Sequence, residues 1–323
     1  MELRIQNLSK RYSNGVQALD HVSLTIGAGM FGLLGPNGAG KSTLMRIIAT
    51  LQEADSGSVT LDGDFASGGS PSIDALNHKD QLRRVLGYLP QEFGLYPKVT
   101  ALQLLDHFAQ LKGIANGRNR RGLVEALLRQ TNLWDARNQK LGTFSGGMKQ
   151  RFGIAQALIG NPKLIIVDEP TAGLDPEERV RFHNLLSEIG EHVIVILSTH
   201  IVSDVSDLCQ SMAIINLGRV LIEGHPLELA RSLRGRIWKK LIARSEVAAY
   251  QEKLPVISSR LVTGRTLIRV YGEAPPEPDF ETVEPDLEDV YFWRVSHTGA
   301  SPAGAFPDAP ASDGSVHGGR PLA

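Results

Sequence analysis

Short apolar runs alternate with longer segments of mixed apolar and polar residues over the first 235 positions of the chain. The runs LIIV (164–167) and VIVIL (193–197) are continuous, which is typical of strands buried on both faces of a parallel sheet. Segments with helical periodicity separate such runs, and this alternation predicts an α/β domain with a largely parallel sheet. The expected strands cover residues 3–9, 22–26, 30–34, 164–168, 193–198 and 212–216, and the expected helices include residues 41–49, 101–112 and 123–130.

The pattern also divides the chain into domains. The first domain is expected over residues 1–235, with its helical middle, about residues 92–160, forming a separate lobe. Short elements then restart, which predicts a small C-terminal α+β domain over residues 236–296. Residues 297–323 are mostly Gly, Ala, Pro and Ser with little to bury, so we expect a disordered tail.

Composition limits the function classes. Apolar residues make up 42% and charged residues 21% of the 323 residues, a globular balance. The formal net charge of −1 gives no general attraction to nucleic acid or anionic lipid. Cys209 is the single cysteine, which excludes an internal disulfide and fits a reducing cytosol. The apolar runs are too short to span a membrane, so we expect a soluble chain that reaches a membrane only through a partner.

Residues 35–42, GPNGAGKS, fit the pattern G-x-x-x-x-G-K-[ST] between an expected strand and an expected helix. Glycines let backbone N–H groups curl around a phosphate, Lys41 would reach the β- and γ-phosphates, and Ser42 would offer its hydroxyl to Mg²⁺. The competing interpretation is a Gly-rich turn with an incidental lysine. The motif predicts a nucleotide site without specifying the reaction.

Two acids, Asp168 and Glu169, end the buried run LIIVDEP. Ligands bind α/β folds at the carboxyl edge of the sheet, where these side chains are expected. Asp168 would hold Mg²⁺ through water, and Glu169 would polarise the attacking water as general base. Alternatively, the two acids are a solvated helix entry.

A third motif, FSGGMKQR (144–151), begins another expected helix. Ser145 would cap it, and Gly146 and Gly147 would open its first turn. Alone, this is an ordinary helix start. If the N-terminus of this helix faces a phosphate, it lies too far along the chain from Lys41 to belong to the same site, unless the helix comes from another subunit.

In chain order, GPNGAGKST, LPQE, SGGMKQR, LIIVDEPTAGLD and STH resemble the motifs of ATP-binding subunits of ABC transporters, over about residues 2–230. The resemblance implies a P-loop NTPase of ABC type, in which an antiparallel β part and a helical lobe join the mostly parallel sheet. It further implies a head-to-tail homodimer with two ATP at its interface, Mg²⁺ as the metal, and an integral membrane permease as partner. It assigns ATP contacts to Tyr12, Gly35, Pro36, Asn37, Gly38, Ala39, Gly40, Lys41, Ser42, Thr43, Ser145, Gly146, Gly147 and Asp175.

The resemblance also assigns roles. Glu169, His200 and Gln91 are the expected catalytic residues, and Ser42, Gln91 and Asp168 the expected metal ligands. His200 would hold the γ-phosphate and orient Glu169, and Gln91 would contact Mg²⁺ and the lytic water. Tyr12 would stack on adenine, and Asp175 would link the two sites of the dimer. Judged by residue type alone, Tyr12 could equally be a surface residue at the end of a strand. A lone histidine after an apolar strand, such as His200, is more typical of a structural residue.

One motif departs from the commonest family pattern, L-S-G-G-Q, because Phe144 and Met148 flank Ser-Gly-Gly here. Met in that place resembles the drug-resistance, sodium and lipid exporter branch. The expected function is therefore an ATPase subunit that powers export by a separate permease, which would dock near Gln91, Phe93 and Tyr96. Such a subunit would be cytoplasmic, peripheral on the inner face of the cytoplasmic membrane.

The alternative is a soluble ABC ATPase acting on ribosomes or DNA. The chain has one phosphate loop, no heptad run and no basic excess, which favours the transporter and predicts no nucleic-acid partner. NGRNRRG (116–122) is expected as a solvated loop rather than a nucleic-acid patch, and His183 as a surface or loop residue.

Overall fold

The computed structural model describes residues 1–63, 65, 72–91, 94, 96–171, 174–191 and 193–297. They belong to two compact units, Met1–Leu227 and Glu228–Ala323, the second described as far as residue 297. The domain bounds expected from the sequence remain predictions. Among the described helices, none has both the length and the apolar character that a membrane span requires.

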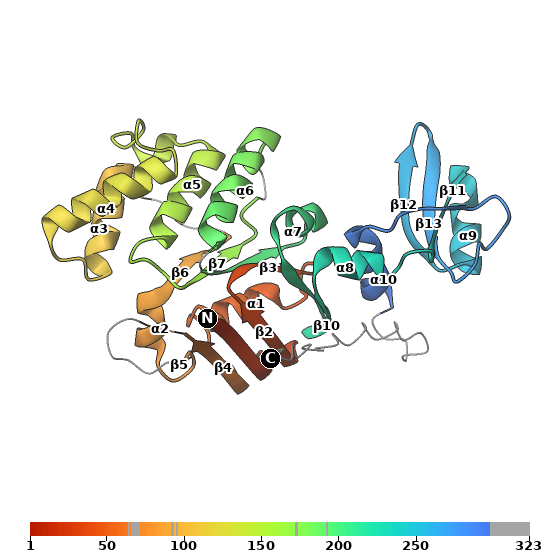
Figure 1. The fold of residues 1–323 in the computed structure, drawn as a ribbon, viewed down its shortest axis with the longest axis horizontal. Coiled ribbons are helices and arrows are strands. Elements are labelled where there is room, and N and C mark those ends of the chain that lie inside the picture. Colours follow the sequence, from red (N-terminus) through yellow and green to blue (C-terminus); the bar gives the residue numbers. More distant parts are fainter. Residues whose placement is uncertain are drawn as a thin grey trace, which may run out of the picture. The chain divides into compact units, whose positions relative to one another are not determined.

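A six-stranded sheet with the order β10-β9-β3-β8-β7-β6 forms the centre of the first unit (Figure 1). Its parallel strands are β3 (Gly29–Leu34), β6 (Leu86–Leu89), β7 (Leu164–Asp168), β8 (Ile194–Thr199) and β9 (Ser211–Asn216), and β10 (Arg219–Gly224) pairs antiparallel with β9. All residues of β7 and β8 are buried, as their continuous apolar runs predict. The predicted α/β fold is confirmed.

The register of this sheet positions the site. Leu34 of β3 pairs with Thr199 of β8, and Asp168 of β7 pairs with Ser198 of β8. The carboxyl ends of these three strands therefore meet at one edge, although they lie far apart in the sequence.

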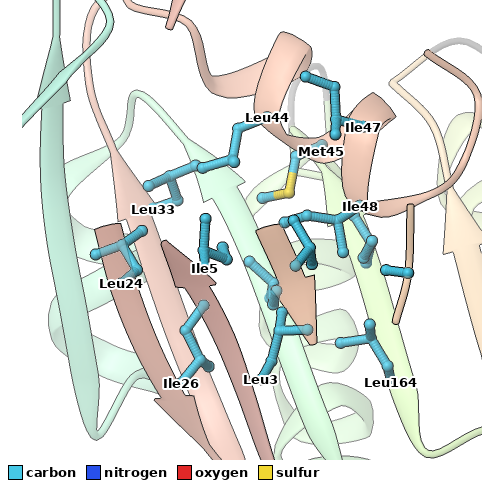
Figure 2. Packing of buried hydrophobic residues seen from close by; sticks show 14 of the residues in the cluster. Leu3, Ile5, Leu24, Ile26, Leu33, Leu44, Met45, Ile47, Ile48 and Leu164 are labelled. Carbon is cyan, nitrogen blue, oxygen red and sulfur yellow. The ribbon is translucent and has the colours of Figure 1, made fainter. Parts of the chain in front are cut away.

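A second, antiparallel sheet has the order β2-β1-β4-β5, with β1 (Glu2–Arg11), β2 (Gln17–Gly27), β4 (Ser56–Asp62) and β5 (Ser72–Asp74). The helix α1 (Lys41–Ile48) shares one apolar core with both sheets. Figure 2 shows this core, with Leu3, Ile5, Leu24 and Ile26 from the second sheet, Leu33 and Leu164 from the first, and Leu44, Met45, Ile47 and Ile48 from α1. This packing fixes the start of α1 at the edge where β3 ends.

A helical lobe has an apolar core of its own. It contains α3 (Ala101–Leu111), α4 (Gly117–Gln130), the 3₁₀ turn η1 (Leu141–Thr143) and α5 (Gly146–Ala157). The prediction of a loop over residues 116–122 is wrong, because α4 begins at Gly117. The side chain of Asn116 accepts hydrogen bonds from the N–H groups of Arg118 and Asn119, and this cap starts α4 before the apolar periodicity begins at residue 123.

Further helices of the first unit are α2 (Lys79–Val85), α6 (Pro176–Gly190), α7 (Val202–Leu208) and α8 (Pro226–Arg231), the last continuing into the second unit. Asp175 caps α6, because its carboxylate accepts a hydrogen bond from the N–H of Glu178 at 2.8 Å. α7 packs on β3 where Gly32 leaves room, since a Cβ there would lie 2.7 Å from Val205 Cγ1.

The second unit is α+β, as predicted. Its antiparallel sheet has the order β12-β13-β11-β14, formed by β11 (Ile237–Ile242), β12 (Val256–Val262), β13 (Arg265–Tyr271) and β14 (Glu281–Thr282). The 3₁₀ turn η2 (Arg244–Glu246), α9 (Val247–Lys253) and α10 (Leu287–Ser296) accompany it. His297 closes α10, with its ring 3.8 Å from that of Trp293, and the rest of the expected tail lies outside the described residues.

Candidate functional site

Glycines shape the loop between β3 and α1 because side chains would not fit there. Gly40 has φ +106°, and a Cβ there would lie 2.4 Å from the carbonyl oxygen of Ala18. A Cβ at Gly35 would lie 2.3 Å from the carbonyl oxygen of Ile215. α1 starts at Lys41 without a side-chain cap, and uncapped N–H groups of a first turn suit an anion. The loop has the form of a phosphate cradle.

Lys41 lies inside this loop, with its side chain only 4% exposed. Its Nζ donates hydrogen bonds to the carbonyl oxygens of Gly35 at 2.7 Å and Pro36 at 3.1 Å. Burial lowers the pKa of Lys41, and the carboxylates of Glu169 and Asp168 offset part of that shift. A phosphate oxygen would interact strongly with this ammonium, since little water screens it.

Glu169 is the point where the catalytic candidates meet. Its Oε1 lies 3.6 Å from Lys41 Nζ and 3.4 Å from His200 Nδ1, and its Oε2 accepts a hydrogen bond from Gln91 Nε2 at 3.1 Å. The side chain is 10% exposed. These four residues come from distant parts of the sequence, so the structure brings together what the motifs suggested.

The backbone of Glu169 is strained. Its φ is +46°, which costs a residue other than glycine roughly 1–3 kcal/mol. Its N–H donates a hydrogen bond to the carbonyl oxygen of Ser198 at 3.0 Å. Such a conformation persists only where neighbours hold it, and here it presents the carboxylate to Lys41, Gln91 and His200.

Oxygen donors suited to Mg²⁺ lie at the same edge. Asp168 is 3% exposed and accepts a hydrogen bond from Ser198 Oγ on the adjacent strand. Ser42 is in the first turn of α1, next to Lys41. Gln91 uses its amide nitrogen for Glu169, which leaves its amide oxygen as a donor to a cation. Carboxylate, hydroxyl and amide oxygens are hard donors that fit Mg²⁺.

Tyr12 lies beside the first turn of α1. Its hydroxyl is 3.0 Å from Thr43 Oγ1 and accepts a hydrogen bond from Gln52 Nε2 at 3.1 Å. The residue is 37% exposed. An aromatic ring anchored at its hydroxyl end beside a phosphate loop suits stacking on a base, and that role stays a prediction.

The third motif lies at the start of α5. Ser145 Oγ accepts a hydrogen bond from the N–H of Met148 at 3.2 Å. Gly147 faces α6, because a Cβ there would lie 2.3 Å from Glu178 Oε2, and Glu178 also pairs with Arg151 at 3.4 Å. Within the described residues, these contacts join Ser145 and Gly147 to α5 and α6, and none joins them to the phosphate loop.

The two departures in this motif have a structural role. Phe144 is 5% exposed in the apolar core of the lobe, and the partly buried Met148 packs against that core. Their side chains therefore stabilise the lobe. Ser145 and the two glycines form the part of the motif at the N-terminus of α5.

Sequence reasoning missed three polar residues around the site. Ser198 holds Asp168, and Thr171 donates a hydrogen bond to Asp204 Oδ2 at 2.6 Å. Asp204 is 0% exposed, yet the polar segment VSDVSDL (202–208) gives no sign of burial. The expectation for His183 was wrong, because it lies in α6 with its side chain 13% exposed and its Nε2 2.9 Å from Asp204 Oδ1.

A groove of about 800 Å³ lies between the end of α1, β6 and the lobe. Leu51 and Leu111 line it and are 62% and 70% exposed. Its other lining residues include the cations Arg83, Arg84 and Lys112. Of the aromatic residues expected at a partner surface, Tyr96 is 63% exposed, and Phe93 lies outside the described residues.

Comparisons with known proteins identify the family to which the chain is similar. Residues 19–172 match the model of the family described as ABC transporter. The chain is 31% identical over 328 residues to the probable multidrug ABC transporter ATP-binding protein YbhF of Escherichia coli, covering 94% of this chain and 54% of that protein, so it spans about half the length of that relative. It is 33% identical over 275 residues to Nod factor export ATP-binding protein I of Burkholderia thailandensis, covering 84% and 86%.

A solved structure is also similar. The dimeric, post-hydrolysis state of the ATP-binding cassette MJ0796 bound to ADP and Pi matches with a TM-score of 0.60 and 29% identity, covering 69% of this chain and 98% of that one.

Proposed function

Since this chain belongs to the ABC transporter family as an ATP-binding protein, we propose that it is the ATP-hydrolysing subunit of an exporter and powers a separate membrane permease. One observation carries the proposal: Lys41 of the phosphate loop, Gln91 and His200 all lie within 3.6 Å of the Glu169 carboxylate. Export is proposed because one relative is named an export ATP-binding protein.

Nucleotide binding uses the phosphate loop. Lys41 exchanges its hydrogen bonds to the carbonyls of Gly35 and Pro36 for oxygens of the β- and γ-phosphates. The backbone N–H groups of the loop and of the first turn of α1 take up the remaining charge. The ring of Tyr12 stacks on the base, held in place through Thr43.

Hydrolysis uses Glu169 as general base. Its carboxylate accepts the proton of the water that attacks the γ-phosphate, and such a base typically contributes 10²–10⁴-fold in rate. Gln91 orients the carboxylate by donating to Oε2, and His200 holds the γ-phosphate from the Oε1 side. Preorganisation of this kind needs little rearrangement during reaction.

Mg²⁺ fits the oxygen donors at this edge, and we propose that Ser42, Asp168 and Gln91 hold it. Bound there, the ion would neutralise charge on the β- and γ-phosphates. Ser198 keeps the Asp168 carboxylate in place through its hydrogen bond.

A second copy of the chain completes the site in this proposal. Ser145, Gly146 and Gly147 present an N-terminus of α5 that contacts α6 rather than the phosphate loop of the same chain. In a head-to-tail homodimer they would face the γ-phosphate bound by the other copy, with Asp175 linking the two sites. The similar MJ0796 cassette is described as dimeric, which supports this arrangement.

The permease is proposed to dock in the groove of about 800 Å³ beside β6. β6 ends two residues before Gln91, so a helix in this groove lies close in sequence to a residue that contacts Glu169. Exposed Leu51 and Leu111, with cations at the rim, suit an amphipathic permease helix that carries acidic residues. Through the permease, the subunit would lie at the inner face of the cytoplasmic membrane.

Membrane fractionation tests this proposal. The tagged chain is expressed alone and together with a candidate permease, and the membrane fraction is compared. The chain should sediment with membranes only in the second case, and Leu51→Glu with Leu111→Glu should abolish that without stopping Mg·ATP hydrolysis. Leu261→Glu, a control at a leucine of similar exposure (71%) in the second unit, should sediment as the wild type does.

Two results would overturn it. Wild-type chain that ignores the permease and co-sediments with ribosomes or DNA would favour the soluble alternative. Absence of phosphate release from Mg·ATP by the wild-type chain, with or without permease, would remove the ATPase role.

A further inference from the structure

We propose that Asp204 is a positioning residue for ATP hydrolysis: its buried carboxylate fixes the two backbone segments that carry Glu169 and His200. The inference rests on the proposed function, because it concerns the same reaction. Asp204 itself touches none of the residues expected to contact ATP among its hydrogen-bond and ion-pair partners in the described part of the chain.

One carboxylate oxygen of Asp204 joins the ends of two strands. Oδ2 accepts a hydrogen bond from Thr171 Oγ1 at 2.6 Å and another from Thr199 Oγ1 at 3.3 Å. Thr171 follows Glu169 by two residues, after β7, and Thr199 directly precedes His200 at the end of β8. Both threonines are buried, at 4% and 1% exposure, so the junction excludes water.

The other oxygen joins the same junction to α6. Oδ1 accepts hydrogen bonds from Arg179 Nη2 at 2.6 Å and Arg179 Nε at 2.9 Å, and it lies 2.9 Å from His183 Nε2. Arg179 and His183 are one turn apart on the face of α6 that meets α7. Asp175, the expected link between the two ATP sites, caps this same helix.

The physical chemistry favours a fixed geometry. A carboxylate at 0% exposure is costly unless donors satisfy it, and here a guanidinium, an imidazole and two hydroxyls do so. Burial alone would raise the pKa of Asp204, but hydrogen bonds from His183, Thr171 and Arg179 outweigh it, and the pKa is lowered. The group is therefore an anion at neutral pH, and charge-assisted hydrogen bonds hold all three segments.

The strain at Glu169 explains why such a junction is needed. Its φ of +46° must be held from both sides. On one side the N–H of Glu169 binds the carbonyl oxygen of Ser198, and on the other Thr171 is held by Asp204. Loss of the Asp204 charge would let the backbone at residue 169 relax, and the carboxylate would move away from its position beside Lys41 and Gln91.

The test uses Asp204→Asn, which keeps the shape of the side chain and removes its charge. Because a small misplacement of a catalytic group costs up to about 10²-fold, we expect kcat for Mg·ATP to fall roughly tenfold to a hundredfold. The KM for ATP and the affinity for a fluorescent ATP analogue should stay within about twofold, since the phosphate loop is untouched. Asp289→Asn is the matched control: Asp289 is 1% exposed and pairs with Arg269 at 2.7 Å in the second unit, so kcat should not change.

A second pair of variants covers poor folding of Asp204→Asn. Thr171→Val removes one hydrogen bond to Asp204 with nearly the same volume, and Thr171→Ser restores the hydroxyl. We expect Thr171→Val to lower kcat several-fold at unchanged KM, and Thr171→Ser to recover most of it. Combining Thr171→Val with Glu169→Gln should add little further loss, because both act on the same proton transfer.

The outcomes separate the two proposals. If wild-type chain does not hydrolyse Mg·ATP, the proposed function fails. If wild type hydrolyses ATP but folded Thr171→Val and Asp204→Asn keep its kcat, only the positioning role fails. That role also fails if the fall in kcat only matches the fraction of unfolded protein, so that the rate per folded molecule is unchanged, or if Thr171→Val and Glu169→Gln have fully additive effects.

Discussion

A glycine of the phosphate loop can be required because its φ is positive or because a Cβ would have no room. Replacing Gly40 by alanine tests both reasons together, and the control Gly38→Ala tests the first alone. Both glycines have positive φ, +106° at Gly40 and +80° at Gly38. A Cβ at Gly40 would lie 2.4 Å from the carbonyl oxygen of Ala18 and 3.1 Å from Leu19 Cδ2, whereas a Cβ at Gly38 meets nothing within 4 Å. The pair therefore differs in steric contact and shares the conformational strain.

The expected magnitudes follow from these contacts. Left-handed backbone costs an alanine about 1–2 kcal/mol, and the gain from a less flexible unfolded chain offsets about 0.4–1 kcal/mol of it. Gly38→Ala should thus lower the free energy of unfolding by about 1 kcal/mol. Overpacking adds about 1–3 kcal/mol at Gly40, because a backbone carbonyl must move, giving about 2–4 kcal/mol in total.

Thermal unfolding followed by circular dichroism measures the difference. One kcal/mol corresponds to roughly 2–4 °C in Tm for a domain of this size, so Gly38→Ala should lower Tm by a few degrees and Gly40→Ala by roughly 5–15 °C. Gly40→Ala should also bind a fluorescent ATP analogue at least about tenfold more weakly, since the loop must shift away from β2. Equal Tm values for the two variants, or ATP binding by Gly40→Ala at the wild-type level, would refute the reasoning.

Three further perturbations have clear expectations. Lys41→Ala should nearly abolish binding of the fluorescent ATP analogue, because the loop loses the cation that neutralises the β- and γ-phosphates; binding at the wild-type level would exclude Lys41 from the site. Burial raises the pKa of the Cys209 thiol to about 12, so it is protonated at pH 8 and should resist iodoacetamide in the folded protein, reacting readily only in urea; rapid labelling of folded protein, read by mass spectrometry, would contradict its burial. Removal of residues 298–323, whose composition offers little to bury, should leave Tm and ATPase activity unchanged, whereas a fall in Tm of many degrees would show that they pack.

The elements of the fold that could be predicted from the sequence are those with strong local sequence patterns. Continuous apolar runs located β7 and β8, because strands buried on both faces must be apolar throughout. β4 and β12 were missed, since each mixes polar with apolar residues and is buried over only part of its length. The predicted start of α4, at residue 123, was too far along the chain, because the first turns of the helix are polar and depend on the Asn116 cap.

The candidate site shows the same limit. Lys41, Gln91, Glu169 and His200 stand in recognisable motifs, and the structure places them together. Thr171 and Ser198 lie inside the motifs LIIVDEPTAGLD and STH, and Asp204 lies outside the motifs, but no pattern marks these three side chains as polar supports of a site. Their roles depend on the register of β7 against β8 and on the packing of α6 and α7, and pairings between distant segments cannot be read from one sequence without its fold.

Phosphate release from Mg·ATP by wild type and Glu169→Gln, with the oligomeric state measured in the same samples by size exclusion, tests the central claim most directly. The amide cannot accept a proton from water, so hydrolysis should fall by about 10²-fold or more while ATP still binds. With ATP trapped, Glu169→Gln should elute as a dimer, and without ATP as a monomer. Wild-type turnover by Glu169→Gln, or a monomer that holds ATP without dimerising, would contradict an ATPase whose two copies close on two nucleotides.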